Sequence, residues 1–414
     1  MHIMKIELVP IEKVIPYARN PRKNKSTISK VAASIKEYGF RQPIVVDENM
    51  VVIVGHARLE ASYNLDLNHV PVHIATGLTS AQIKAYRIAD NRTHEDSSWN
   101  DELLTIELGE LYEDKFDLSL TGFEEIEWER LLAEPEKEGL VDDDDVPQAP
   151  EQPVTKRGDI WILGKHRLIC EDSTSPHAIE QLLDGRLADM VFTDPPYNIN
   201  YKGSVTDREK GQKRIIQNDN LGGLFGKFLY DVCHNMLSVS KGAIYICMSS
   251  SELHTLYDAF TQAGGKWSTF IIWVKNHFNL GQSDYQRQYE AILYGWQNGS
   301  KHYWCGDRNQ SDTWFYDKPI SNDLHPTMKP VDLVAKAIKN SSRSKDIVLD
   351  PFGGSGSTLI ACEKLHREAR LVEIDEKFCD VIIRRWQDYT GEDAILSSTG
   401  QTYMKLASAE KRKG

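Results

Sequence analysis

Residues 348–358 read VLDPFGGSGST, a short apolar strand followed by a glycine-rich turn and the start of a helix near Ser357. Such a turn brings backbone amides and a helix N-terminus towards an anionic group. The spacing matches neither the GxGxxG fingerprint of dinucleotide-binding folds nor the GxxxxGK(S/T) phosphate loop, because no lysine follows the last glycine. A generic glycine turn is the alternative interpretation.

An acidic residue follows this turn at the distance typical of ribose binding. Residues 371–375 read LVEID, which predicts a second apolar strand that ends in an acidic pair. A carboxylate about 20 positions after a glycine turn is placed to bind a ribose diol. Together the two segments indicate a nucleoside-binding half-sheet.

Strand and helix patterns alternate through the second half of the chain. Apolar runs predict strands at 189–193, 243–248, 269–274, 347–350 and 371–374. Amphipathic stretches predict helices at 224–237, 251–264, 331–341, 357–365 and 377–390. This alternation predicts an α/β domain with a parallel sheet covered on both faces, in which ligands bind beyond the carboxyl ends of the strands.

The apolar strand at 190–193 leads into Asp194-Pro195-Pro196-Tyr197. Two prolines give a rigid turn in which the preceding residues are extended and two N–H donors are missing. The turn therefore presents a carboxylate, a backbone carbonyl and an aromatic face at the mouth of the sheet. A strand-end turn with a buried tyrosine is the alternative interpretation.

Four motifs occur in a single order: DPPY at 194–197, HPTMKP at 325–330, DPFGGSGST at 350–358 and VEID at 372–375. This set resembles the S-adenosylmethionine-dependent DNA amino-methyltransferases, and its order resembles their β group. The resemblance covers residues 158–395 and implies a Rossmann-like, seven-stranded methyltransferase fold. It also implies double-stranded DNA as the partner and S-adenosylmethionine as the cofactor, with no metal required for methyl transfer.

The resemblance implies a set of cofactor-binding residues. They are Asp172, Lys329, Asp350, Phe352, Gly353, Gly354, Ser355, Gly356, Ser357, Thr358 and Glu373. In this set Glu373 would accept hydrogen bonds from the ribose, and Lys329 would pair with the cofactor carboxylate. Asp172 would contact the cofactor adenine, although Glu171 stands where the family usually has glycine.

The same resemblance makes Asp194, Pro195, Pro196 and Tyr197 the catalytic turn. An exocyclic amine of adenine or cytosine is a poor nucleophile because its lone pair is delocalised into the ring. Hydrogen bonds from its two N–H groups to Asp194 and the Pro195 carbonyl would favour a pyramidal nitrogen for in-line transfer. The base must leave the stacked duplex, and Tyr197 would stack on it.

The leading Asp of the tetrapeptide favours adenine N6 as the target, because cytosine-N4 relatives more often carry Ser there. Cytosine N4 is the first alternative. A second is a nucleotide-gated DNA-binding protein whose methyltransferase half is a non-catalytic platform. Methylation of RNA or of a protein amide is a third.

Two regions between the motifs are candidates for DNA contact. The polar loop at 201–220 carries basic residues suited to phosphate contact: Lys202, Arg208, Lys210, Lys213 and Arg214. Residues 273–325 are rich in Asn, Gln, Trp and Tyr and are a candidate target-recognition insert. A solvated loop without a role is the alternative for the first region, and aromatic core residues are the alternative for part of the second.

Residues 5–110 resemble the ParB/sulfiredoxin-like domain, through the segments NPRK at 20–23, GFRQPI at 39–44, VGHARLEA at 54–61 and ADNR at 89–92. Sulfiredoxin activity is excluded because the turn Gly55-His56-Ala57-Arg58 has no cysteine. The resemblance implies a nucleoside triphosphate or phosphate site formed by Arg22, Gly55, His56, Arg58, Asn91 and Arg92. The alternatives are a DNA-contact or specificity module and a purely structural or nuclease domain.

The length of 414 residues exceeds what one hydrophobic core supports, so two domains are expected. The net charge of -12 comes from residues 95–157, which alone carry -16, whereas residues 1–94 carry +5 and 158–414 carry -1. We expect a small α+β ParB-like domain at 1–132, in which residues 100–132 form an acidic helical appendage. An acidic Pro-rich linker is expected at 133–157 and the methyltransferase domain at 158–414. The Asp142–Asp145 run is interpreted as a solvated spacer, with a DNA mimic on a basic groove as the alternative.

The sequence has no apolar run long enough to span a bilayer, no CxxC pair and no apolar stretch of signal-peptide length near Met1. These features predict a cytoplasmic enzyme with reduced cysteines and no membrane partner. A homodimer is left open.

Overall fold

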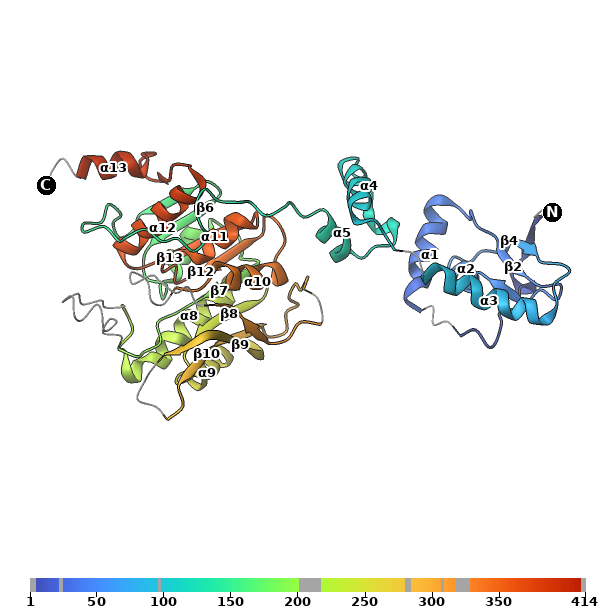
Figure 1. The fold of residues 1–414 in the computed structure, drawn as a ribbon, viewed down its shortest axis with the longest axis horizontal. Coiled ribbons are helices and arrows are strands. Elements are labelled where there is room, and N and C mark those ends of the chain that lie inside the picture. Colours follow the sequence, from blue (N-terminus) through green and yellow to red (C-terminus); the bar gives the residue numbers. More distant parts are fainter. Residues whose placement is uncertain are drawn as a thin grey trace. The chain divides into compact units, whose positions relative to one another are not determined.

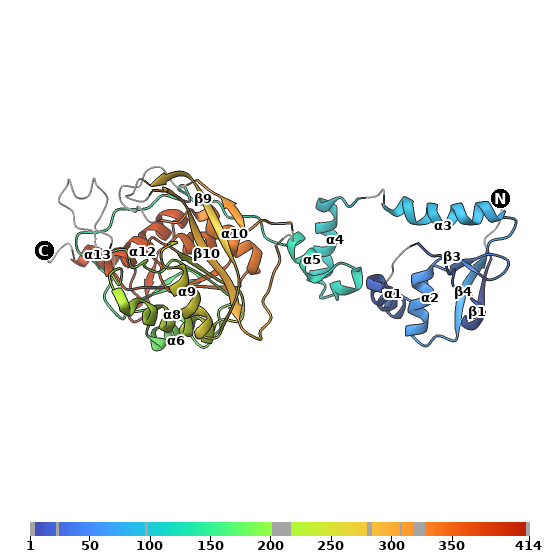
Figure 2. The same ribbon diagram turned by 90° about the horizontal axis from the view of Figure 1, so that it is seen from below.

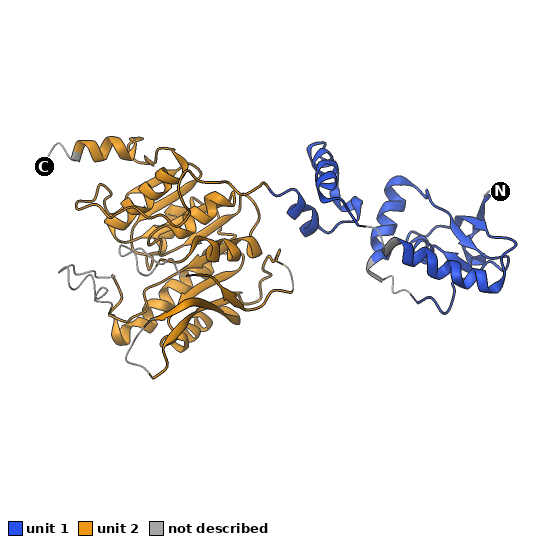
Figure 3. Ribbon diagram, in the orientation of Figure 1, with its two compact units in different colours: residues 1–133 blue, residues 134–414 orange. Residues whose placement is uncertain are grey.

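The computed structural model describes residues 5–21, 25–95, 98–200, 217–279, 284–306, 309–317 and 328–410. The chain forms two compact units, residues 1–133 and 134–414 (Figure 3). Among the helices of the described ranges, none combines the length and the apolar character needed to cross a bilayer. All six cysteines lie in these ranges, and none forms a disulfide.

The first unit is built on a four-stranded sheet with the order β1-β4-β2-β3. The elements of this part are β1 (Ile6–Pro10), a 3-10 turn (Ile11–Lys13), α1 (Lys25–Tyr38), β2 (Ile44–Val46), β3 (Val52–Val54), α2 (His56–Asn64), β4 (His69–Ile74) and α3 (Ser80–Glu95). Apolar residues of the strands pack with Leu59 of α2 in a small core. The predicted α+β domain is observed, with β1 as an edge strand that the sequence pattern did not indicate.

A helical cluster completes the first unit. It contains α4 (Asp101–Glu113), a 3-10 turn (Leu118–Thr121) and α5 (Glu125–Leu131), which pack around Leu104, Leu108 and Leu118. The Asn100 side chain caps α4 by accepting hydrogen bonds from two backbone amides of its first turn. The acidic appendage expected at 100–132 is therefore a small helical assembly with an apolar centre.

The second unit has a ten-stranded sheet with the order β11-β9-β10-β8-β7-β12-β13-β6-β5-β14. Its strands are β5 (Ile160–Leu163), β6 (His166–Cys170), β7 (Met190–Thr193), β8 (Ile244–Met248), β9 (Gly265–Asn279), β10 (Arg287–Gln297), β11 (Thr313–Phe315), β12 (Ile347–Asp350), β13 (Glu368–Glu373) and β14 (Ile395–Leu396). The five strands β8-β7-β12-β13-β6 are parallel, and β10 pairs antiparallel with both β8 and β9. The α/β fold is confirmed, but the sheet has ten strands instead of seven, because β11, β5 and β14 extend its two edges.

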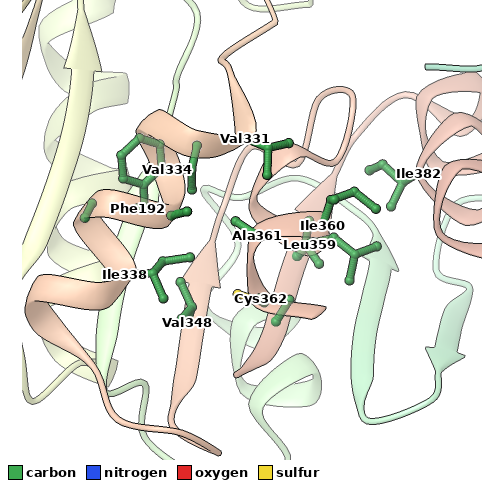
Figure 4. Close-up of a cluster of buried hydrophobic side chains, with 14 of the residues drawn as sticks. Phe192, Val331, Val334, Ile338, Val348, Leu359, Ile360, Ala361, Cys362 and Ile382 are labelled. Atoms are coloured by element: carbon green, nitrogen blue, oxygen red, sulfur yellow. The ribbon is translucent and has the colours of Figure 1, made fainter. Parts of the chain in front are cut away.

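Helices cover both faces of this sheet (Figures 1 and 2). They are α6 (Pro176–Leu183), α8 (Phe225–Val239), α9 (Leu253–Gln262), α10 (Val331–Ser341), α11 (Ser357–Lys364) and α12 (Glu376–Thr390), followed by α13 (Tyr403–Glu410). One core contains apolar residues of α10, α11 and α12, and the other contains those of α6, α8 and α9. Phe192 of β7 enters the first core and Val191 the second, because successive side chains of a strand point to opposite faces. Figure 4 shows Phe192 and Val348 facing Val334 and Ile338 of α10.

The acidic segment 134–145 packs onto the second unit, which differs from the expected solvated spacer. The Lys364 ammonium lies 2.6 Å from an Asp143 carboxylate oxygen, and the Arg385 guanidinium donates a 2.8 Å hydrogen bond to the Asp143 carbonyl. The backbone N–H of Val331 donates to Asp144 Oδ1 at 3.0 Å. The acidic run therefore contacts basic side chains of α11 and α12 and a backbone amide of α10. Its amino-acid composition alone did not reveal these partners.

Candidate active site

Three motifs meet at the carboxyl ends of three adjacent parallel strands. The DPPY turn follows β7, the glycine-rich turn follows β12, and the acidic pair Glu373 and Asp375 follows β13. Because β7, β12 and β13 are neighbours in the sheet, motifs that are far apart in sequence lie at one edge. The prediction that the glycine turn and the acidic residue form one site agrees with this topology.

A single cavity joins the catalytic turn to the glycine-rich turn. Its lining includes Asp194, Pro195, Pro196, Tyr197, Lys329, Asp350, Phe352, Gly353, Gly354, Ser355, Ser357, Thr358 and Glu373. A smaller hollow beside it is lined by Asp172 and shares Phe352 and Glu373 with the cavity. Gly356, the remaining predicted cofactor residue, is the N-cap of α11 with φ +86°. The structure thus brings the predicted catalytic and cofactor residues together around one concave region.

Asp350 fixes the glycine-rich turn to the catalytic strand. It is buried, and its two carboxylate oxygens accept 2.7 Å hydrogen bonds from the hydroxyls of Thr193 and Thr358. Burial raises the pKa of Asp350 to about 7, although these hydrogen bonds oppose the shift. Because Thr193 precedes Asp194 and Thr358 lies in the first turn of α11, one carboxylate holds both sides of the cavity.

Glu373 organises the opposite wall. Its carboxylate accepts hydrogen bonds from the backbone N–H of Gly354 at 2.8 Å and of Asp375 at 2.9 Å. Burial raises the pKa of Glu373 to about 7. A side chain at Gly353 would place its Cβ 3.0 Å from Ile382, so the turn needs glycine there to stay close to α12. A glycine turn held against a carboxylate that borders a cavity fits a ligand with a diol, such as a nucleoside.

Four ionised side chains form a cluster at the DPPY end of the cavity, and the Tyr197 hydroxyl joins them. The four are Asp194, Lys275, Glu290 and Lys329. The Lys329 ammonium is 2.6 Å from Asp194 Oδ2 and 2.7 Å from Glu290 Oε1. Glu290 Oε2 is 2.8 Å from the ammonium of Lys275, and the Tyr197 hydroxyl contacts both Asp194 and Glu290. The predicted pairing of Lys329 with a cofactor carboxylate would require its ammonium to leave these partners.

The cluster sets the protonation of its members. Burial raises the pKa of Asp194, and the Lys329 ammonium counteracts that rise. Burial and the adjacent carboxylates raise the pKa of Tyr197 well above its ordinary value, so the phenol keeps its proton. Burial also opposes ionisation of Glu290, but the ammonium groups of Lys329 and Lys275 lower its pKa to about 2. Asp194, Cys247 and Glu290 are close enough to hold a metal ion, but the Lys329 ammonium contacts both carboxylates and supplies the positive charge there.

Asp172 has local hydrogen bonds in the smaller hollow. Its Oδ1 accepts from the backbone N–H and the hydroxyl of Thr174 at 2.9 and 2.8 Å. Glu171, which replaces the usual glycine, pairs with Arg157 and does not line the main cavity. The role of Asp172 in adenine contact stays a prediction.

The basic residues proposed for DNA contact, Lys202, Arg208, Lys210, Lys213 and Arg214, lie outside the described residues, as does Arg22. Part of the proposed target-recognition insert belongs to the sheet, since β9 and β10 pair over most of their length. Trp273, at the start of that region, is buried in the core, which agrees with the alternative interpretation of part of its aromatic residues. The target-recognition role of 273–325 stays a prediction.

The predicted phosphate site of the first unit lies at the start of α2. Gly55 is the N-cap of α2 with φ +101°, and no side chain caps that end. His56 Nε2 is buried without a hydrogen-bond partner, and burial lowers the pKa of His56. Burial lowers the pKa of Arg58, and the charge of Asp90 on α3 counteracts that shift in part. Asn91 donates a hydrogen bond to the Arg87 carbonyl within α3.

Two residues around the cavity were not singled out from the sequence, Glu290 and Thr193, and Lys275 was considered only as part of the candidate target-recognition insert. Glu290 and Lys275 lie on neighbouring antiparallel strands, and Thr193 is the last residue of β7. A carboxylate followed by the apolar run at 291–294 is the signal that could have revealed Glu290, because a charge at the end of a buried strand needs a partner. No local sequence signal distinguishes Thr193 from an ordinary strand residue.

A carboxylate-containing DPPY turn beside a glycine-rich nucleoside cradle defines a methyltransferase-type site. Family models match three parts of the chain: DNA methylase over residues 188–384, ParB-methyltransferase HTH domain over 102–157, and ParB N-terminal domain over 2–91. Residues 188–384 therefore form an N6/N4 DNA methylase domain, in a DNA methyltransferase that also carries a ParB N-terminal domain. The HTH match covers both the helical cluster and the acidic segment.

Two relatives with similar sequences agree with this assignment. The chain is 27% identical over 260 residues to the Type II methyltransferase M.HpaI of Haemophilus parainfluenzae, covering 55% of this chain and 77% of the relative. It is 35% identical over 80 residues to the ParB-like nuclease domain-containing protein YnaK of Escherichia coli, covering 19% and 92%. The M1.HpyAVI-SAM complex is similar in structure with a TM-score of 0.42 and 22% identity, covering 53% of this chain and 97% of that one.

Proposed function

We propose that this DNA methyltransferase modifies the N6 amine of adenine in double-stranded DNA, with S-adenosylmethionine bound in the cavity between Asp194 and Glu373. The observation that carries the proposal is the Asp194 carboxylate, which borders the same cavity as the glycine-rich turn. The cofactor supplies an electrophilic methyl group when bound. Adenine is preferred over cytosine because the tetrapeptide begins with Asp.

Residues at one end of the cavity would bind the cofactor, and residues at the other end would bind the target amine. Glu373 offers acceptors for ribose hydroxyls, and the turn at 353–358 offers a close backbone surface. Asp194 and the Pro195 carbonyl would accept the two amine hydrogens, which frees the nitrogen lone pair for in-line attack. Tyr197 borders the space that a flipped base would enter, where its ring offers a stacking surface.

The test is product analysis. Purified full-length protein is incubated with S-adenosylmethionine and unmethylated DNA of diverse sequence, and the nucleosides are quantified by mass spectrometry. N6-methyladenine is the expected product. N4-methylcytosine would keep the chemistry but overturn the choice of base, and methylation of RNA alone would overturn the substrate class.

We also propose nucleoside triphosphate binding at the start of α2 in the first unit. The uncapped amides after Gly55, together with Arg58, suit a phosphate group. Binding of each common ribonucleoside triphosphate to the full-length protein and to Arg58→Ala tests this, and equal affinity of the two proteins would refute it.

We also propose that the protein forms a homodimer. Sedimentation of the full-length protein in the presence of nucleotide tests this.

A further inference from the structure

Asp194 has both of its carboxylate oxygens occupied within the protein. The Tyr197 hydroxyl donates to Oδ1, and the Lys329 ammonium contacts Oδ2 at 2.6 Å. A target amine must donate its own hydrogen to this carboxylate. Each oxygen keeps a second lone pair, so the amine can bind, but the Tyr197 hydroxyl and the Lys329 ammonium compete with it for the negative charge of Asp194.

Glu290 offers an alternative acceptor to each occupant. The Tyr197 hydroxyl also contacts Glu290 Oε1, and the Lys329 ammonium lies 2.7 Å from the same oxygen. A phenol has one proton, so Tyr197 can donate to either Asp194 or Glu290 at a given moment. Both groups can shift towards Glu290 without leaving the cluster.

Glu290 is itself anchored from behind. Its second oxygen, Oε2, is held 2.8 Å from the Lys275 ammonium, and the two side chains are only 11% and 12% exposed. Lys275 is on β9 and Glu290 on β10, so a pair of adjacent strands supports the carboxylate. Glu290 does not line the cavity, whereas Asp194, Tyr197 and Lys329 do. It can act on a base only through those residues.

We infer that Glu290 is a positioning residue which accepts the Tyr197 hydroxyl and the Lys329 ammonium when Asp194 turns to the target amine. This inference rests on the proposed function of Asp194. Two carboxylates and two ammonium groups make the cluster neutral overall. Without the Glu290 charge, Lys329 has Asp194 as its only carboxylate in the cluster and competes with the amine for it.

The test compares Glu290→Gln with the parent enzyme. Glutamine keeps the shape and one neutral acceptor but removes the charge. We expect kcat to fall about 10- to 100-fold, as for a lost hydrogen bond to a charged group, while S-adenosylmethionine affinity stays unchanged. The like charge of Glu290 contributes to the raised pKa of Asp194, so the acid limb of the kcat profile should move to lower pH in the variant. A purely structural role would not move that limb.

Tyr197→Phe provides a second measurement that does not depend on the stability of one variant. Phenylalanine removes the hydroxyl that occupies Asp194 Oδ1, so part of the need for Glu290 disappears. The double variant should therefore lose less activity than the two single effects multiplied. An unchanged kcat in Glu290→Gln, an unmoved acid limb, or independent effects in the double variant would overturn the inference. If Asp194→Ala retained activity, the proposed function would fail instead, which keeps the two failures distinguishable.

Discussion

Thr193 donates a 2.7 Å hydrogen bond from its hydroxyl to Asp350 Oδ1, which joins the end of β7 to the end of β12. The residue after Thr193 is Asp194, the proposed catalytic residue, and the residues after Asp350 form the glycine-rich turn. Thr358 completes the junction from the first turn of α11 through a 2.7 Å bond to Asp350 Oδ2. The distance between the methyl-accepting and the cofactor-binding ends of the cavity is therefore set by buried side chains.

Asp350→Ala should damage both stability and cofactor binding. The change leaves two buried hydroxyls without their acceptor, which costs about 2–4 kcal/mol of the free energy of unfolding. Urea denaturation and calorimetry with S-adenosylmethionine measure the two effects. Asp350→Asn is the control, because the amide retains an acceptor and should lose less. Equal stability of Asp350→Ala and the parent would refute the role of this junction.

Cofactor affinity should depend on pH through Glu373. Burial raises its pKa to about 7, and ribose hydroxyls donate more strongly to the ionised carboxylate. Affinity should therefore rise between pH 6 and 8 and level off above that range. Glu373→Gln should bind about 10-fold more weakly and lose most of the pH dependence. Any remaining dependence would report Asp350, whose pKa is also about 7. An unaltered pH profile in Glu373→Gln would contradict the assignment.

Arg385 should couple the acidic segment to the cofactor turn. Its buried guanidinium donates hydrogen bonds to the carbonyls of Ser355 at 2.9 Å and Asp143 at 2.8 Å. Arg385→Met should cost about 2–3 kcal/mol in the free energy of unfolding and weaken S-adenosylmethionine binding. Arg384→Met on the same helix is the control, since Arg384 contacts only the Gln148 carbonyl among the hydrogen bonds of the described residues. It should change stability by less than about 0.5 kcal/mol. Matching effects of the two substitutions would refute the coupling.

Gly55→Ala should selectively impair nucleotide binding by the first unit. Gly55 and Gly77 both have positive φ, +101° and +76°, so alanine costs about 1–2 kcal/mol at either position. Only at Gly55 would the new Cβ contact other residues, Arg58 at 3.4 Å and Ile44 at 3.5 Å, whereas nothing lies within 4 Å at Gly77. Gly77→Ala is therefore the control for strain alone. Fluorescence titration with nucleotide should show weaker binding in Gly55→Ala only, and equal loss in both would contradict the assigned site.

The sequence was informative wherever the signal is local. Apolar periodicity predicted the strand that ends at Asp350 and the helix that begins at Ser357, because both depend on neighbouring residues. The DPPY and glycine-rich motifs are short segments whose residues act together. Their meeting at one sheet edge also followed, since parallel strands align their carboxyl ends.

The rest of the site depends on pairing between distant segments. Glu290 reaches Tyr197 across 93 positions, and its register is set by β10 pairing with β8, which no local pattern encodes. The acidic segment has the composition of a spacer, but its partners Lys364 and Arg385 lie on α11 and α12 more than 200 positions away. Amino-acid composition gives the charge of a segment but not the groups that this charge contacts in the fold.

One comparison tests whether Asp194 takes part in methyl transfer to an amine. Full-length parent enzyme and Asp194→Ala are mixed with saturating S-adenosylmethionine and unmethylated DNA, and methyl transfer is followed in a single turnover while cofactor binding is measured separately. We predict undiminished cofactor binding and a loss of N6-methyladenine formation of at least about 100-fold, because the amine loses its charged acceptor. Methylation by Asp194→Ala at the parent rate would contradict the proposed role of Asp194 as the acceptor for the target amine.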